Sequence, residues 1–466
     1  MLPRPRALML VVALLAATSL GLSGALPAGA ATADPRPGPA ATPSAMPAAG
    51  TFYPTAPVRV LGSPTGGYAV SPGSPATVAT AGRSGLPSSG VSALMVNVVA
   101  TAGASDARLG LTAAGGVSPA PLLAVPAGTT SSTLVTVPLA TTSGFDVSAV
   151  GGPATVTADV LGFYAADDTV VAGYGLSGGY QPVEVTPLYE SAADTAIPPG
   201  GRVLLAVDLG GPATAHTTAL LVHVTSKDTT APGSLSVSSP SAPSPPSAVS
   251  APGDPDAVLP ATVSFAAGAR AGNLALVPAE VDSSGRLGIA VTNTSAAPAG
   301  YALDLVGFYD DGGIGPNLRF RALPQTRVLD TATGLGGVSA LTPGVGGRTT
   351  LADAVADDST FALAGVLSIT TAAASTVTVR SPDAVIPAAG DAPVAAGRTS
   401  VALQSEVGAG RDLTVMAGPG SGSAPMGLTL DLVGTFEAHP PVTNAAARRW
   451  VPPVSPWQIS AVPRAS

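Results

Sequence analysis

The sequence predicts an all-β protein of three tandem antiparallel β-sandwich modules, of jelly-roll or immunoglobulin-like type, with little helix. Three observations lead to this prediction. The chain has 56 Gly and 48 Pro among 466 residues, and both residue types break helices. Short apolar runs alternate with polar residues at period two, which is typical of strands. The same strand-like segments also recur three times along the chain in the same order.

The N-terminal residues 1–33 are predicted to be a secretory signal peptide. Arg4 and Arg6 supply the positive start, and the apolar stretch ALMLVVALLAA follows them. Small residues then offer cleavage sites after Ala30 or Ala33. An uncleaved signal anchor is the alternative. The signal peptide leads us to expect a secreted or extracellular protein. The chain has no cysteine, which excludes disulfides and a cysteine-linked lipid anchor.

The charge of the chain argues against two classes of partner. The formal net charge is −8, and it becomes −10 without residues 1–33, which hold two Arg and no acidic residue. Such a chain, with Lys227 as its single lysine, lacks the basic surface that binds nucleic acids or anionic lipids. Apolar runs outside the N-terminal segment are too short to cross a bilayer. We therefore expect no nucleic-acid partner and no membrane segment after signal cleavage.

Each module ends in a closing segment of the same pattern. The copies read TADVLGFY at 157–164, ALDLVGFY at 302–309 and TLDLVGTF at 429–436. The third residue is always Asp, the sixth is always Gly, and the eighth is always aromatic. These repeated structural positions are Asp159, Asp304, Asp431, Gly162, Gly307 and Gly434.

Each module also begins with an opening segment. The copies read FYPTAPVRVLGS from Phe52, YQPVEVTPLYES from Tyr180 and FRALPQTRVLDT from Phe320. Arg59 and Arg327 stand seven residues after the first aromatic in modules 1 and 3, whereas module 2 has Pro187 there.

Two further strand-like segments recur between the opening and the closing. ALMVNVVAT (93–101) resembles ALLVHVTSK (219–227) and VLSITT (366–371), and STLVTVP (132–138) resembles NLALVP (273–278) and SVALQ (400–404). Period-two patterning with short spacers predicts antiparallel sheets, and about 110–125 residues per module suit a two-sheet sandwich. A β-barrel or a β-trefoil is the alternative.

Composition and repeats together divide the chain. Residues 34–50 are rich in Pro and Ala and are predicted to form an extended linker. Module 2 is the longest because of a Ser/Pro-rich run at 238–256, which we expect to be a surface loop. The expected modules are residues 51–166, 178–311 and 318–438, and residues 439–466 form a tail with part of a fourth opening segment.

These segments resemble a repeat module of secreted proteins from high-GC actinobacteria. The module opens like F-x-P-L-x-P-x-R-V-L-D-T-R-T-G, continues like V-L-N-V-T-A-T and N-L-V-x-V-P, and ends like A-D-V-V-G-Y-Y. The matching blocks are RVLDTATG (327–334), VNVVAT (96–101), NLALVP (273–278), ADVLGFY (158–164) and LDLVGFY (303–309). The resemblance covers residues 52–437, although module 2 lacks the opening Arg. It implies export and a cell-envelope or extracellular setting, and it implies no catalytic residue.

The repeated aspartates are the best polar candidates for a site. One carboxylate per module does not make the carboxylate pair of a glycosidase. Each Asp lies on the strand face opposite the predicted core, and its neighbour two positions on is apolar, which indicates a partly covered face. We interpret the three as structural residues that accept hydrogen bonds, with Arg59 and Arg327 as candidate partners.

The histidines predict neither a metal site nor a catalytic triad, because His216, His223 and His439 are scattered. His223 lies opposite the apolar face of the strand-like ALLVHV and is therefore predicted to face solvent. We align it with Asn97 and Ser368.

Three short polar motifs are interpreted as linker features. Residues 175–179 match G-x-S-x-G but lack the following helix of a nucleophile elbow, so they are predicted to be a flexible interdomain linker. The doublets Asp167-Asp168 and Asp310-Asp311 offer too few oxygens for Ca²⁺ by themselves. They are interpreted as solvated charge.

We therefore expect an exported, non-enzymatic protein that acts as a structural or interaction component at the cell surface or in the cell wall. Its partner would be a cell-wall polymer or another surface protein, and no catalytic residue, metal or cofactor is expected. The alternative is an array of carbohydrate-binding modules, which the low count of 18 aromatics weakens. An extracellular hydrolase is the third candidate.

The tail resembles a fourth opening segment, WVPPVSPWQIS from Trp450. Trp450 and Trp457 are the two tryptophans of the chain, and burying them would contribute a large apolar area. We expect residues 448–460 to dock on module 3 as a terminal cap. A free, truncated relic is the alternative.

Overall fold

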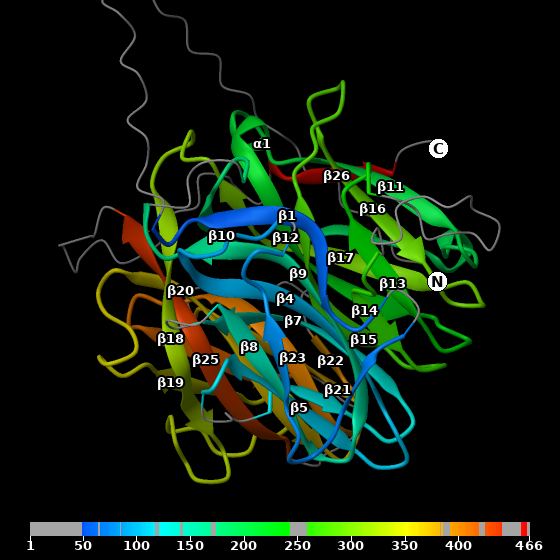
Figure 1. The fold of residues 1–466 in the computed structure, drawn as a ribbon. Coiled ribbons are helices and arrows are strands. Elements are labelled where there is room, and N and C mark those ends of the chain that lie inside the picture. Colours follow the sequence, from blue (N-terminus) through cyan, green and yellow to red (C-terminus); the bar gives the residue numbers. More distant parts are fainter. Residues whose placement is uncertain are drawn as a thin grey trace, which may run out of the picture. The chain divides into compact units, whose positions relative to one another are not determined.

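Antiparallel strands make up almost all of the regular structure (Figure 1). The computed structural model describes residues 49–63, 66–83, 85–116, 121–139, 143–168, 174–242, 259–382, 384, 392–418, 425–439 and 458–463. Within these residues α1 (Ala213–His216) is the one α-helix, and a 3₁₀ turn covers Ala193–Thr195. The predicted all-β class is therefore confirmed. The predicted signal peptide, nearly all of the 34–50 linker and most of the 238–256 insertion lie outside the described residues. No helix in the described ranges is long and apolar enough to cross a membrane.

Each module contributes eight principal strands. Module 1 has β1 (Phe52–Leu61), β3 (Ala76–Ala79), β4 (Val91–Ala102), β5 (Ala107–Ala113), β6 (Leu123–Val125), β7 (Thr130–Pro138), β8 (Gly144–Gly151) and β9 (Ala154–Ala165), with the short β2 (Tyr68–Val70) beside β9. Module 2 has β10 (Gly179–Glu190), β11 (Arg202–Asp208), β12 (Thr217–Lys227), β13 (Gly233–Ser238), β14 (Val263–Phe265), β15 (Ala271–Pro278), β16 (Leu287–Asn293) and β17 (Gly300–Asp310). Module 3 has β18 (Asn317–Asp330), β19 (Gly346–Thr350), β20 (Thr360–Thr371), β21 (Ser375–Arg380), β22 (Ala392–Val394), β23 (Gly397–Glu406), β24 (Asp412–Ala417) and β25 (Gly427–His439).

The strand order is the same in all three modules. One sheet, which we call the inner sheet, runs β1-β9-β4-β7, β10-β17-β12-β15 or β18-β25-β20-β23. The outer sheet runs β3-β8-β5-β6, β11-β16-β13-β14 or β19-β24-β21-β22. If the eight strands of a module are numbered in chain order, the sheets read 1-8-3-6 and 2-7-4-5, which is the order of a jelly roll. The strand order therefore selects the jelly roll over the immunoglobulin-like, barrel and trefoil alternatives.

The inner sheets are covered on both faces. In β12, Leu220 and Val222 belong to the sandwich core of module 2, whereas Ala219 and Leu221 belong to a separate core. Residues of all three modules form that second core, which we call the central core. A strand buried on both faces must be apolar at nearly every position, which explains the continuous apolar runs of the recurring segments.

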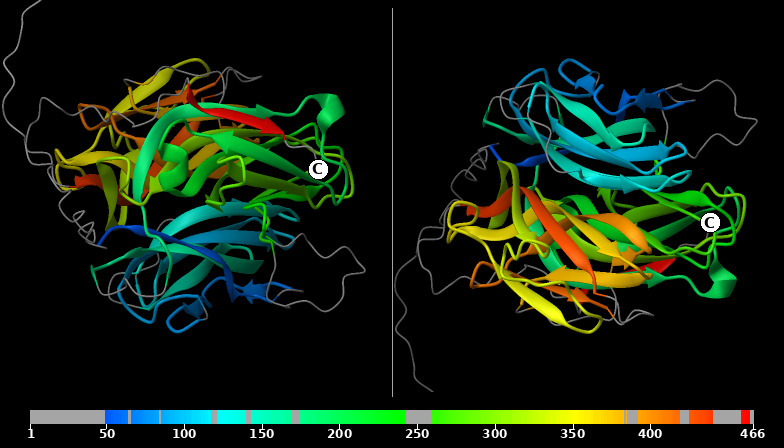
Figure 2. Two further views of the ribbon diagram at one scale, coloured as in Figure 1. Left: turned by 90° about the horizontal axis from the view of Figure 1, so that it is seen from above. Right: turned by 90° about the horizontal axis from the view of Figure 1, so that it is seen from below.

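The three jelly rolls close into a ring. Strand β7 contacts β14 of module 2, β15 contacts β22 of module 3, and β23 contacts β6 of module 1. Head-to-tail contacts form a closed ring when the last unit returns to the first. Residues 46–466 accordingly form one compact unit, in which blue-to-cyan, green and yellow-to-orange strands gather in separate sectors (Figure 2).

Two of the ring junctions share the same hydrogen bond. At the junction of modules 1 and 2, the backbone N–H of Ser264 donates to Oγ of Ser132 at 2.9 Å. At the junction of modules 3 and 1, the N–H of Ala124 donates to Oγ of Ser400 at 3.2 Å. These bonds show that the repeated sequence makes repeated contacts between modules.

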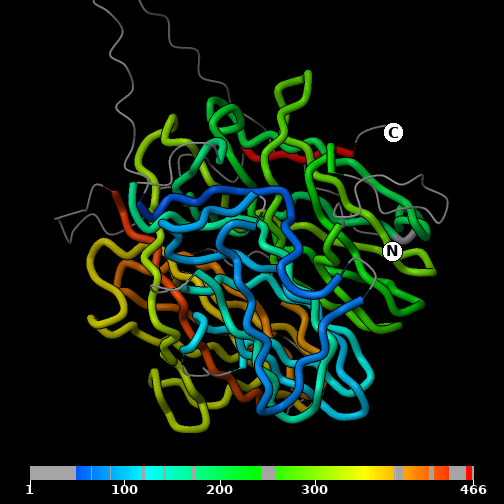
Figure 3. Tube along the Cα trace, in the orientation of Figure 1, coloured from blue at the N-terminus to red at the C-terminus, as the bar shows by residue number. Residues whose placement is uncertain are grey.

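The C-terminal strand β26 (Ser460–Pro463) pairs antiparallel with β11 of module 2, where the red segment lies along the green strand (Figure 3). The predicted docking of residues 448–460 on module 3 is therefore wrong for the part that is described. Edge strand β11 offers unpaired backbone groups, and β26 satisfies them. Ile459 and Ala461 also pack against the core of module 2. Trp450 and Trp457 lie outside the described residues.

Candidate functional site

The aromatic residues of the opening and closing segments meet in the central core. Phe52, Tyr180 and Phe320 start the openings, Tyr164, Tyr309 and Phe436 end the closings, and all six are buried. Each opening ring contacts the closing ring of its own module and that of the next module in the ring. The ring centroids across the three junctions lie 4.5 Å apart for Phe52–Tyr309, 4.5 Å for Tyr180–Phe436 and 4.1 Å for Phe320–Tyr164. The repeated aromatics therefore hold the modules together.

The repeated glycines make room for these rings. Gly162, Gly307 and Gly434 each lie opposite the opening strand of their module. A Cβ at any of the three positions would overlap the ring of Phe52, Tyr180 or Phe320, respectively. The glycine is thus required by close approach of a ring across the ladder, as is known for aromatic–glycine pairs in sheets.

Backbone bonds follow the same cyclic path. Phe52 pairs with Gly178, Tyr180 pairs with Leu318, and the N–H of Phe320 donates to the carbonyl of Gly50 at 2.9 Å. Each partner stands two residues before the opening aromatic of the following module. Gly178 and Gly50 are therefore fixed in the ring, and their assignment to a flexible linker and to the 34–50 linker was wrong.

A hydrogen-bonded group of polar side chains lies inside the central core. The hydroxyls of Tyr164 and Tyr309 are 2.7 Å apart, and the Tyr309 hydroxyl also donates to Oε1 of Gln404 at 3.4 Å. Burial raises the pKa of Tyr164 well above its usual value, so both rings stay neutral. The group connects modules 1, 2 and 3 at one place and satisfies its own buried polar atoms.

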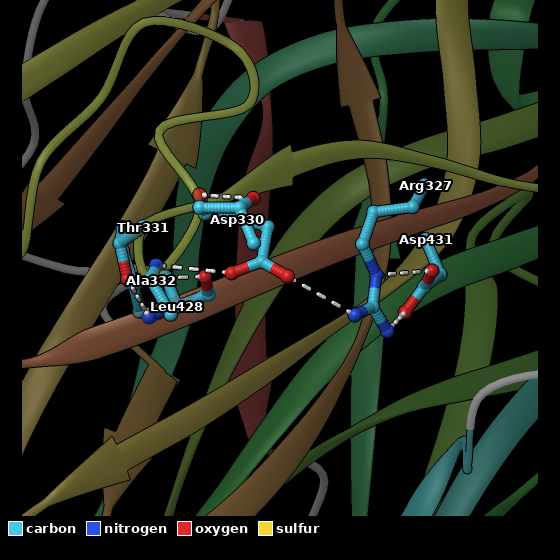
Figure 4. A network of polar contacts seen from close by, with 7 residues as sticks. Arg327, Asp330, Thr331, Ala332, Leu428 and Asp431 are labelled. Atoms are coloured by element: carbon cyan, nitrogen blue, oxygen red, sulfur yellow. Dashed lines mark hydrogen bonds and ion pairs between the residues drawn. The ribbon is translucent and has the colours of Figure 1, made fainter.

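Two of the repeated aspartates form bidentate ion pairs with the opening arginines. Nε and Nη2 of Arg59 lie 2.6 and 3.2 Å from the two carboxylate oxygens of Asp159. In module 3 both distances from Arg327 to Asp431 are 3.0 Å, and Asp330 also accepts from Arg327 at 3.3 Å (Figure 4). Such forked pairs fix the first strand of the inner sheet against the last.

Burial and ion pairing shift the pKa values of these groups in different directions. Desolvation raises the pKa of Asp159, and the bond from Arg59 offsets only part of that rise. The bond to Asp431 raises the pKa of Arg327. In module 2, Asp304 is also buried, opposite Pro187 and beside His223. The residue that pairs across the ladder with this carboxylate is therefore Arg59 or Arg327 in modules 1 and 3, and Pro187 in module 2.

His223 is buried, so its predicted exposure to solvent was wrong. It lies on the face of β12 that turns away from the core of module 2, against Gly272 and close to Pro393 of module 3. Desolvation lowers the pKa of His223 to about 4, and its Nε2 has no hydrogen-bond partner within the described residues. The register opposite the repeated Asp aligns His223 with Asn97 and Val366, so the alignment with Ser368 was two residues off.

We expect His223 to make the fold less stable in acid. Its pKa is about 4 in the folded chain and about 6.5 when exposed, so the unfolded chain binds the proton first as the pH falls between these values. The free energy of unfolding should drop by about 3 kcal/mol from pH 7.5 to pH 4 through this group. Urea unfolding of the wild type and of His223→Gln at both pH values isolates the effect from the carboxylates. Equal pH dependence in the two proteins would contradict it.

The doublet Asp310-Asp311 is not solvated charge, so that interpretation was wrong, whereas Asp167 and Asp168 are exposed, as expected. Asp310 is fully buried, where it accepts hydrogen bonds from Nε2 of Gln181 at 2.8 Å and from the N–H of Gly312 at 2.6 Å. Asp311 pairs with Nδ1 of His216 at 2.9 Å. The described residues contain no group of three or more His, Cys, Asp or Glu that could hold a metal ion.

No sequence motif indicates the clefts that open where modules meet. A cleft of 450 Å³ lies at the junction of modules 1 and 2, and a cleft of 560 Å³ lies at the junction of modules 3 and 1. Their linings come from segments far apart in the chain, so no single motif identifies them.

Comparison with known proteins adds little to this description. No family model matches the chain, and no curated protein matches its sequence. One similar solved structure is described as "Life in the extremes: atomic structure of Sulfolobus Turreted Icosahedral Virus", at 9% identity over 74% of this chain and 80% of the other, with a TM-score of 0.15. Another is described as "The Triple Jelly Roll Fold and Turret Assembly in an Archaeal Virus", at 9% identity over 83% of this chain and 91% of the other, also with a TM-score of 0.15. At such TM-scores the jelly-roll assignment comes from the strand order of this chain alone.

Proposed function

We propose that this chain is an exported, non-catalytic protein that serves as a structural or interaction component at the cell surface or in the cell wall. The observation that supports the proposal is the use of the repeated residues. The aromatics and glycines pack the central core, and Arg59 and Arg327 hold two of the repeated aspartates in ion pairs. The repeated residues thus build the ring itself, which is the use expected of a scaffold.

A closed ring suits a structural role for a physical reason. Contacts between modules fix the relative positions of the outer sheets and loops, which a string of modules on flexible linkers would leave variable. The carbohydrate-binding alternative is less well supported. Among the described aromatics, Tyr68 is the one with more than a third of its surface exposed, and stacking platforms need exposed rings.

Binding to cell-wall material tests the proposal. The mature chain, residues 34–466, is incubated with isolated cell-wall fractions beside a folded acidic protein of similar charge, and both are washed in high salt. We expect selective retention of this chain. Recovery in the supernatant together with the control protein would contradict the proposal. Binding to isolated neutral glycans on an array would instead favour the carbohydrate-binding alternative.

Export makes a separate prediction about the N-terminus. Small residues before Ala30 and Ala33 predict signal cleavage there, so the mature protein recovered from culture should begin between residues 29 and 35. N-terminal sequencing measures this directly. A chain that starts at Met1, or one that remains in a membrane pellet after washing in high salt, would be evidence for the signal-anchor alternative.

A further inference from the structure

The cleft at the junction of modules 3 and 1 is polar and carries arginines from two modules. Arg108 on β5 comes from module 1, whereas Arg327 on β18 and Arg398 on β23 come from module 3. The hydroxyl-bearing residues that line the cleft are Thr331, Ser368, Thr370, Ser400 and Thr429. Its 560 Å³ falls in the range of small-molecule sites.

The three arginines differ in their partners. Arg327 is bonded to Asp431 and to Asp330, which is the one carboxylate in the cleft lining. The backbone N–H of Ala332 donates to the other oxygen of Asp330, which holds that carboxylate beside Arg327 (Figure 4). Within the described residues, the guanidinium groups of Arg108 and Arg398 have no ion-pair or hydrogen-bond partner. Two guanidinium groups are thus left to face the cleft of a chain whose net charge is −8.

The other two junctions show that packing does not require these arginines. The strand pairing shows which residues of the other modules are equivalent to Arg398. Leu134, Leu274 and Ala402 occupy equivalent positions, because they pair with the equivalent residues Asn97, His223 and Val366. Four residues before them stand Thr130, Arg270 and Arg398, respectively. The equivalents of Arg108 follow from the pairing of β5 with β6, of β13 with β14 and of β21 with β22. The second pair of residues in these ladders contains Arg108, Ser234 and Thr376, respectively.

Each junction therefore has its own pair of residues at these two positions. The junction of modules 1 and 2 has Thr130 and Ser234, and both line the equivalent cleft of 450 Å³. The junction of modules 2 and 3 has Arg270 and Thr376. The hydrogen bond and charge of Lys227 lower the pKa of Glu190, and the charge of Arg270 adds to that effect. Only at the junction of modules 3 and 1 do both positions hold a cation in the described structure.

We propose that this cleft binds an oxyanion, a carboxylate or a phosphate, on a polyhydroxylated ligand such as an acidic sugar. The proposal rests on the proposed cell-surface function and names the ligand class of the ring. Guanidinium forks match the geometry of carboxylates and phosphates, and an anion between Arg108 and Arg398 would relieve the repulsion of two like charges. The serine and threonine hydroxyls of the lining can donate to and accept from sugar hydroxyls.

Isothermal titration calorimetry with defined probes tests the cleft. The mature chain is titrated with glucuronic acid, with glucose 6-phosphate and with glucose, so that the carboxylate and phosphate sources are distinguished and the neutral sugar serves as the reference. Arg108→Ser and Arg398→Thr introduce the residues found at the equivalent positions of the junction of modules 1 and 2. Arg270→Thr is the matched control, because it removes one cation from an equivalent position outside the cleft.

We expect saturable binding of at least one charged sugar and at least tenfold weaker binding of glucose. Arg108→Ser and Arg398→Thr should each weaken the affinity for the charged probe by about tenfold or more, which is the effect of losing one charge-assisted hydrogen bond. Arg270→Thr should bind like the wild type, and all three variants should keep the melting temperature of the wild type without ligand. Equal binding by all proteins, or no binding of either charged probe, would overturn the proposal. Retention on cell-wall fractions despite that result would leave the proposed function standing.

Discussion

Replacing Phe320 with Ala is expected to lower the free energy of unfolding of the ring by about 3–5 kcal/mol. The ring of Phe320 is buried, stacks on Tyr164 of module 1 at 4.1 Å and lies 5.2 Å from Phe436 of its own module. Truncation removes both contacts and leaves a cavity over Gly434, whose missing Cβ cannot fill it. Guanidinium unfolding measures the change, and Tyr68→Ala, at a ring 52% exposed, is the matched control with a change of about 0.5 kcal/mol or less.

Calorimetry of the same variant distinguishes a ring from a string of modules. Because the Phe320 ring contacts module 1 as well as module 3, its loss should lower the melting temperature of a transition that involves all the modules. Three separate transitions, of which only that of module 3 moves, would show that the modules unfold independently and that the central core contributes little.

The sequence predicts the sandwich and its repeated residues well, because period-two patterning and the recurring Asp, Gly and aromatic positions are local features. It does not predict what covers the second face of each inner sheet. The recurring segment of β12 contains a signal of this, since Ala219 and Leu221 are apolar on the face that was expected to be polar. A continuous apolar run in a strand indicates burial on both faces, and only the fold identifies the neighbouring module as the cover.

His223 and the tail show the same limit. His223 lies on the same face of β12 as Ala219 and Leu221, so it is buried with them, although its polar side chain led us to expect exposure to solvent. Its counterpart in module 3 is Val366, because both residues pair with the repeated Asp of their module. A period-two apolar pattern does not distinguish this alignment from one that is shifted by two residues. The pairing of β26 with β11 depends on which edge strand is open in the folded ring. No local pattern near residue 460 contains that information.

Replacing Arg59 with Ala is expected to destabilise the fold by about 3 kcal/mol at neutral pH. The side chains of Arg59 and Asp159 are only 13% and 2% exposed, so the substitution leaves a buried carboxylate without its counter-ion. Arg327→Ala is the matched control in module 3. Its side chain is 36% exposed, so water already screens its attraction to Asp431, and we expect a smaller loss of about 1 kcal/mol.

Acid should reduce the cost of Arg59→Ala. Burial already raises the pKa of Asp159, and removal of Arg59 takes away the interaction that lowers it, so the folded variant binds a proton at a higher pH than the unfolded chain does. A group whose pKa is raised in the folded state makes the fold more stable as the pH falls, because protonation removes the buried charge.

Urea unfolding at pH 7.5 and 4.5 should therefore show a smaller difference in free energy of unfolding between the variant and the wild type at the lower pH. Arg59→Met combined with Asp159→Asn should recover most of the loss at pH 7.5. A difference that grows in acid would mean that Arg59 stabilises the fold through its packing and not through the carboxylate. The pH series therefore decides between the two explanations.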